Sequence, residues 1–86
     1  MLEYFERIDA LAAKSRKLPN PDACHDMLVM CNAAHNIAVE LSKELVECRR
    51  RGKLSARSET LINQLDESID NVEKMLTYAT LRYAKK

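Results

Sequence analysis

Apolar residues recur every three or four positions along two long stretches of the chain. The more regular run consists of Ile62, Leu65, Ile69, Val72, Leu76, Ala79 and Tyr83. The other run consists of Met27, Met30, Ala34, Ile37, Leu41 and Cys48, and Glu44 is its one break. Spacings of three and four place side chains on one face of an α-helix. The pattern therefore predicts two long amphipathic helices.

Proline and capping residues mark where the first two helices end and begin. The segment LPNP at residues 18–21 ends a first helix near Lys17, because proline disfavours helical geometry in the residue before it. Asn20 is typical of a helix cap, and Pro21 is typical of a first helical position. We expect a first helix over about residues 2–17 and a second helix that begins at about residue 21.

Arginine, glycine and serine mark the connection to the last helix. Three arginines followed by Gly52 are typical of a helix C-terminus, where cations face the negative end of the helix dipole and glycine adopts a left-handed conformation. Either Ser55 or Ser58 can cap the next helix. The second helix is therefore expected to end at about residue 51, and the third to span about residues 55–84.

The short connection between the two long helices predicts an antiparallel hairpin about 45 Å long. The first helix is about half as long and carries its own apolar face, formed by Leu2, Phe5, Ile8, Leu11 and Ala12. We expect it to pack beside the start of the second helix and the end of the third, where it would cover Tyr78 and Leu81. The predicted fold is all-α: one domain over residues 1–86, in which a short N-terminal helix packs on a long hairpin with coiled-coil-like spacing to form a three-helix bundle.

The first helix is too short to reach the half of the hairpin next to the turn. Four apolar residues in that half are expected to contact a second subunit or another protein: Val39, Val46, Leu54 and Leu61. Two helices rarely close a core on their own, so self-association as a homodimer is expected. The alternative is that a bent hairpin buries these side chains itself.

Composition excludes several classes of protein. One glycine, two prolines and 5% aromatic residues in 86 positions disfavour a sheet. Fourteen basic and thirteen acidic residues give a net charge of +1, which provides no bulk attraction to nucleic acid or anionic lipid. No apolar run approaches the roughly 18 residues that span a bilayer, so no membrane partner is expected. Three cysteines and an acidic start, MLEYFERID, favour a reducing, cytoplasmic setting.

The segment CHDMLVMCNAAH, residues 24–35, raises the possibility of a metal site. Along a straight helix Cys24 lies about 10 Å from Cys31 and about 16 Å from His35, so one ion cannot bind all three. Only Cys31 and His35, four residues apart, could act together as two metal ligands or as a thiol and its base. A structural zinc ion needs four ligands, which the pair reaches only if a dimer doubles it. Because free cysteine is common in helix interfaces, the favoured interpretation is that these residues pack against the first helix, and no cofactor is expected.

The predicted turn is rich in positive charge. Five basic side chains gather there: Arg49, Arg50, Arg51, Lys53 and Arg57. In a dimer they could contact phosphate groups of nucleic acid. Glu47 and Glu59 dilute this charge, and no aromatic residue lies among the basic ones for base stacking. The favoured interpretation is therefore a solvated helix end, and nucleic-acid binding is the alternative.

The chain has no glycine-rich phosphate loop, and its neighbouring carboxylates lie on an expected exposed face, so an enzyme is not expected. The leading hypothesis is a small non-enzymatic protein-protein interaction module, such as a regulator, inhibitor, adaptor or chaperone-like accessory protein. The alternatives are a nucleic-acid-binding dimer that uses the basic turn and a metal-responsive regulator that uses Cys31 and His35.

Overall fold

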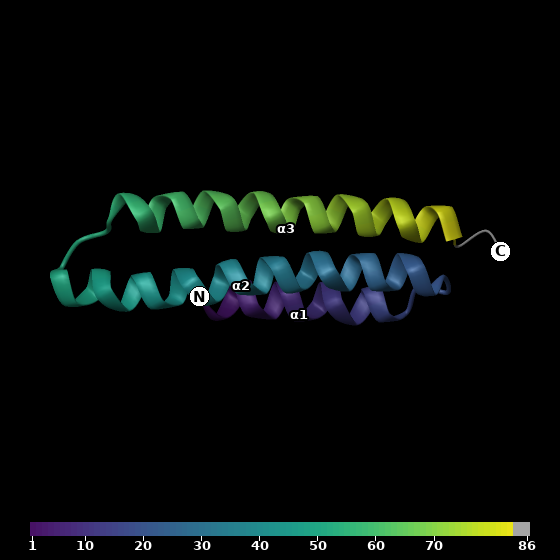
Figure 1. Ribbon diagram of the computed structural model, residues 1–86, viewed down its shortest axis with the longest axis horizontal. Helices are drawn as coiled ribbons and strands as arrows, with labels where there is room; N and C mark the ends of the chain where they lie inside the picture. The colour runs from purple at the N-terminus through teal and green to yellow at the C-terminus, as the bar shows by residue number, and fades with distance from the viewer. Residues whose placement is uncertain (84–86) are drawn as a thin grey trace.

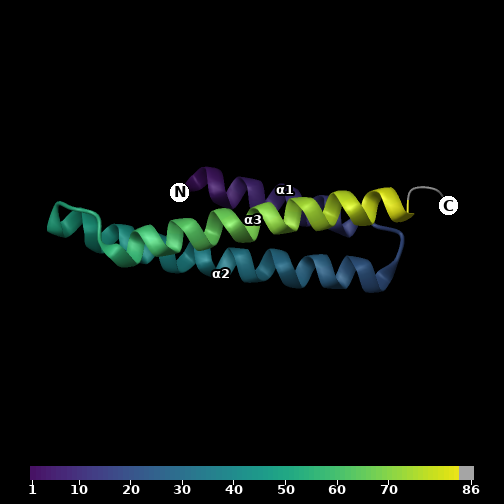
Figure 2. The same cartoon turned by 90° about the horizontal axis from the view of Figure 1, so that it is seen from above.

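The computed structural model describes residues 1–83 and contains three α-helices: α1 (Leu2–Arg16), α2 (Pro21–Arg51) and α3 (Ala56–Tyr83). The long helices α2 and α3 form an antiparallel hairpin, and α1 packs along the half of it that is distant from the turn (Figures 1 and 2). The molecule measures 54 × 17 × 16 Å. The predicted all-α three-helix bundle is confirmed.

The helix ends follow from local chemistry. The side-chain oxygen of Asn20 accepts a hydrogen bond of 2.9 Å from the Ala23 amide, and Pro21 is the first residue of α2. Gly52 follows α2 with φ at +78°, and its amide donates to the Cys48 carbonyl oxygen at 2.8 Å. A residue with a Cβ atom is strained in that left-handed conformation, so glycine suits this position.

Both candidate serines contribute to the start of α3. The Ser55 hydroxyl oxygen accepts from the Ser58 amide at 3.0 Å, and the Ser58 hydroxyl oxygen accepts from the Ser55 amide at 3.1 Å. This reciprocal pair is a capping box in which serine replaces the usual glutamate. Ser58 is fully buried, and its hydroxyl donates to the Ser55 carbonyl oxygen at 2.7 Å. No polar atom of this buried serine is left without a partner.

The hydrophobic core runs along the contact between α2 and α3 and extends under α1. Its buried members are Ile8, Leu11, Met27, Cys31, Ala34, Ala38, Leu41, Leu61, Leu65, Ile69, Val72 and Leu76. Leu41, Leu65 and Ile69 have no exposed surface. Burying one such side chain contributes about 1.5–3 kcal/mol, so this row of contacts is what stabilises the hairpin.

Polar contacts also join α1 to α3. The Tyr4 hydroxyl donates to the Asp66 carboxylate at 2.8 Å, and Arg7 forms an ion pair with Glu73 at 3.0 Å. The Arg7–Glu73 pair is half exposed, so its contribution is about 0–1 kcal/mol. Both contacts are exposed, so they add little to the burial of Ile8 and Leu11, which holds α1 on the hairpin.

The expected cover of Tyr78 and Leu81 is wrong. Their side chains are 62% and 64% exposed. The reason is that α1 packs more extensively on α2 than on α3, so it does not wrap around the outer side of α3. Leu81 lies at the border of a shallow groove between α1 and α3 that also includes Leu11 and Leu76.

Candidate interaction surfaces

The hairpin is only two helices thick next to the turn, because α1 begins beside the middle of α2 (Figure 1). We call residues 39–62 the turn half. Val46 and Leu54 are each 60% exposed there, and Val39 is half-buried. Leu61 is only 8% exposed, so its predicted place on an outer contact surface is wrong. It lies one helical turn from both Ser58 and Leu65 on the buried line of α3, and the hairpin buries it without a partner.

Val46 lies on the same side of α2 as the residues that α1 covers nearer the N-terminus of α2. Leu28 and Val46 are 18 residues apart, which is five full helical turns, so they share one face of α2. His35 lies between them on that face, and its ring meets the Phe5 ring of α1 edge-on, with 5.3 Å between centroids. Beyond the first residues of α1 the same face of α2 is uncovered among the described residues.

Glu44, the one break in the apolar run of α2, holds the end of the hairpin together. Its carboxylate accepts a hydrogen bond of 3.0 Å from the Ser55 hydroxyl and lies 3.9 Å from the Arg57 guanidinium. The Cys48 thiol also lies against the Ser55 hydroxyl, at 3.6 Å. The break therefore has a structural reason that only the position of α3 reveals.

Acidic neighbours partly neutralise the basic turn. Arg50 pairs with Glu47 at 3.1 Å. Arg57 lies 3.6 Å from Glu40, in addition to its contact with Glu44. Within residues 1–83 the other three predicted cations, Arg49, Arg51 and Lys53, are exposed and form no ion pair. The pairing of Arg50 and Arg57 weakens the electrostatic case for nucleic acid.

Both members of the candidate metal pair contact α1. Cys31 is buried, its sulfur lies 4.0 Å from the Ser15 hydroxyl, and burial raises the pKa of its thiol. A raised pKa opposes formation of the thiolate, which is the form that binds metal or acts as a nucleophile. His35 is the ring that packs on Phe5. Among residues 1–83, no group of three or more histidine, cysteine, aspartate or glutamate side chains is arranged to hold a metal ion.

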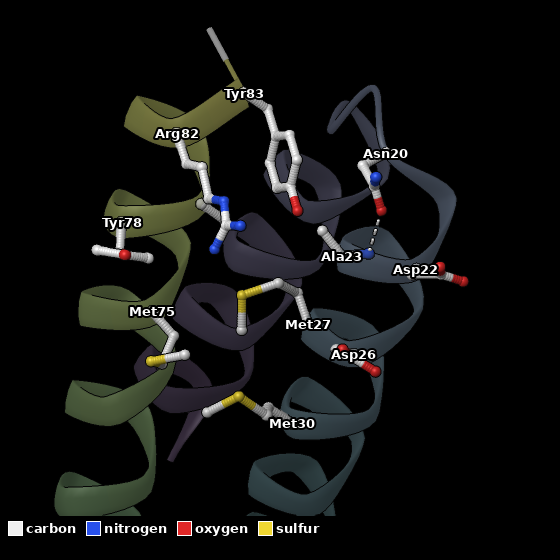
Figure 3. A pocket seen from close by; sticks show the side chains of 11 residues that line it. Asn20, Asp22, Ala23, Asp26, Met27, Met30, Met75, Tyr78, Arg82 and Tyr83 are labelled. Carbon is white, nitrogen blue, oxygen red and sulfur yellow. Dashed lines mark hydrogen bonds between the residues drawn. The ribbon is translucent and has the colours of Figure 1, made fainter.

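A second surface that no other part of residues 1–83 covers lies at the opposite end of the hairpin, on the face away from α1 (Figure 3). There α2 and α3 border a groove of about 330 Å³, which we call the Met groove. Its lining includes Met27, Met30, Met75, Tyr78 and Ala79, with Asp22 and Asp26 on the α2 edge and Arg82 on the α3 edge. Met27 is buried core, as expected from its spacing, whereas half of the Met75 side chain is exposed.

Comparisons of the chain with models of protein families, with curated proteins and with solved structures found no significant match. Among the described residues, no helix is both long enough and apolar enough to cross a lipid bilayer. Helical hairpins support many unrelated functions, so a functional argument depends on the surfaces themselves.

Proposed function

We propose that this chain is a non-enzymatic helical module that binds another protein through its turn half. The observation that supports the proposal is the exposure of Val46 and Leu54, at 60% each, on the part of the hairpin that α1 leaves uncovered. Apolar side chains of this size favour contact with another apolar surface over contact with water.

The partner surface that fits best is an amphipathic helix. On the same side of α2, α1 already shows how such a helix binds, with Ile8 and Leu11 buried against the hairpin. A partner helix next to the first residues of α1 would cover Val39 and Val46 in the same way, with anchors spaced by three and four residues. Leu54, in the connection between the long helices, would contact the far end of that helix.

Site-specific photo-crosslinking in cells of the source organism tests this proposal. A photoreactive amino acid at Val46 should give a discrete adduct with another protein, and adding Leu54→Glu should abolish that adduct. The matched control places the same amino acid at Glu67, an exposed position on α3 outside the turn half. Circular dichroism should show that each variant keeps its helical content.

Two results would contradict the proposal. One is the same set of adducts from Val46 and from Glu67, which indicates non-specific contact. The other is an adduct of twice the chain mass and no other, which would make a second copy of this chain the occupant of the turn half.

A further inference from the structure

Within residues 1–83, the hairpin face opposite α1 is uncovered along its length and carries three exposed apolar side chains near its open end. Met75 and Tyr78 line the Met groove from α3 (Figure 3). Val29 is more than half exposed and lies within about 60° of Asp26 around α2. Met30 is half-buried in the same groove. These exposed apolar side chains favour contact between this end of the face and another apolar surface.

The two edges of this face carry opposite charges. On α2, Asp26 and Glu44 are 18 residues apart and therefore point the same way, with Asp22 and Glu40 close to that line. Arg51, 25 residues from Asp26, is the one cation near the same line, and it lies next to the turn. On α3, Arg57 and Arg82 fall within about 20° of each other around the helix. Except for Arg51 beside the turn, the α2 edge of the face is therefore negative, and the α3 edge is positive.

The charges at the two ends of the face differ in what they already contact. Near the turn, Arg57 is paired with Glu40 and Glu44 of its own chain. At the open end, Asp22 and Asp26 are exposed and have no ion pair within the described residues, and the Arg82 guanidinium lies 5.8 Å from the centre of the Tyr83 ring. The carboxylates beside the Met groove are thus available to a second molecule.

We infer that two copies of this chain form a dimer through this face, with the two-fold axis parallel to the helices. That rotation places α2 of one copy against α3 of the other. It does not shift any residue along the helix axes, so residues at the same height in the two copies face each other. Asp26 then lies opposite the partner subunit's Arg82, and the same contact occurs twice. The inference does not depend on the turn half.

A two-fold axis perpendicular to the helices, in the plane of the face, would bring like charges together. It would place α2 over the second α2, so that two acidic edges and two basic edges meet. Like charges in contact repel each other and weaken an interface. Charge therefore selects the axis parallel to the helices.

Packing favours the same arrangement. The two hairpins together form a four-helix bundle. Each of these helices has antiparallel neighbours, which is a common geometry for helix bundles. Met30 and Met75 lie between the two copies near the open end, where flexible thioether side chains fill irregular space. Val29 lies opposite the partner subunit's Tyr78. The face measures at most 54 by 17 Å, which is compatible with the roughly 800 Å² that each partner contributes to a stable interface.

Charge reversal tests the inference, with dissociation constants measured by analytical ultracentrifugation. Asp26→Arg and Arg82→Asp should each weaken the dimer at least about tenfold, because each places like charges together. The double variant restores opposite charges in exchanged positions and should return the dissociation constant to within about threefold of the parent, since the pair contact is re-formed. Glu6→Arg, an equal charge change on exposed α1, is the matched control and should have no such effect.

Other variants identify the face. Met75→Glu should weaken the dimer, whereas Val46→Glu in the turn half should leave it intact. A parent chain that stays monomeric at several hundred micromolar would overturn the inference, and so would a dimer that neither charge reversal weakens. Dissociation by Val46→Glu would overturn it as well, because the turn half would then form the dimer contact.

Discussion

Cys31 lies in the interface between α1 and α2, where a small apolar side chain is needed. Its sulfur is 4.0 Å from the hydroxyl of Ser15, and Ser15 is itself fully buried. The Ser15 hydroxyl donates to the Leu11 carbonyl oxygen at 2.7 Å, so this buried polar group is satisfied within α1. The surroundings of Cys31 are those of a packed thiol.

The raised pKa of Cys31 predicts how stability depends on pH. The cause of the shift is burial, so the folded state holds the proton more tightly than the unfolded state. The stabilisation is fully present below the ordinary thiol pKa of about 8.5 and is lost as the pH rises towards the folded-state value. Urea unfolding at pH 7 and pH 9.5 should therefore show a larger loss of stability in the parent than in Cys31→Ala. Equal losses in the two proteins would contradict this prediction.

The sequence predicted that Cys31 and His35 pack against the first helix, but it could not show which residues of that helix cover them. Helical spacing alone places the two residues on one face of α2. Their neighbours are Ser15 and Phe5 of α1, and no local pattern specifies which residues of α1 lie opposite which residues of α2. For the same reason, the sequence could not predict that Asp66 accepts a hydrogen bond from Tyr4 of α1.

At the scale of the elements, a few residues between α2 and α3 are enough to reverse the chain direction. Gly52 ends α2, and the capping box of Ser55 and Ser58 begins α3. Glu44 joins the two ends through its hydrogen bond to Ser55. The backbone groups at both helix ends therefore find hydrogen-bond partners within a few residues, so local hydrogen bonds hold the turn.

Replacing Gly52 tests the contribution of its backbone conformation. A Cβ atom at this position would have no heavy atom within 4 Å, so the cost of Gly52→Ala is conformational and not steric. The expected loss is about 1 kcal/mol of unfolding free energy, measured by urea denaturation. Gly52→Asn should cost less, because asparagine tolerates positive φ better. An unchanged stability in the alanine variant would mean that the turn adopts another conformation.

The helices themselves were predictable because their signals are local. Six of the seven residues in the predicted run of α3 lie in or against the core, and Asn20, Pro21 and Gly52 mark the ends of α2. Leu61 was not predictable, because α3 carries adjacent leucine and isoleucine at 61 and 62. Only the direction in which α2 packs decides that Leu61 is buried and that Ile62 is partly exposed.

At the scale of the whole molecule, the asymmetry of α1 creates two uncovered surfaces. α1 covers one face of the hairpin over the half distant from the turn (Figure 2). The turn half is left uncovered on the same side, and the Met groove is left uncovered on the other. The exposed apolar side chains of α2 and α3 are divided between these surfaces and the outer side of α3, where Leu81 lies. The two surfaces lie on opposite sides of the hairpin, so the two proposed contacts do not compete for the same residues.

The overall dimensions of the dimer distinguish the two surfaces by small-angle X-ray scattering. A dimer through the face opposite α1 keeps its long dimension close to the 54 Å of one chain, because its two-fold axis is parallel to the helices. A dimer through the turn half overlaps the chains only near the turn, so each extends beyond the other and the particle is longer. The maximum dimension of the parent should therefore match that of a monomeric Asp26→Arg variant, while the cross-section grows. A parent particle clearly longer than that monomer would favour contact through the turn half, since only partial overlap lengthens the assembly.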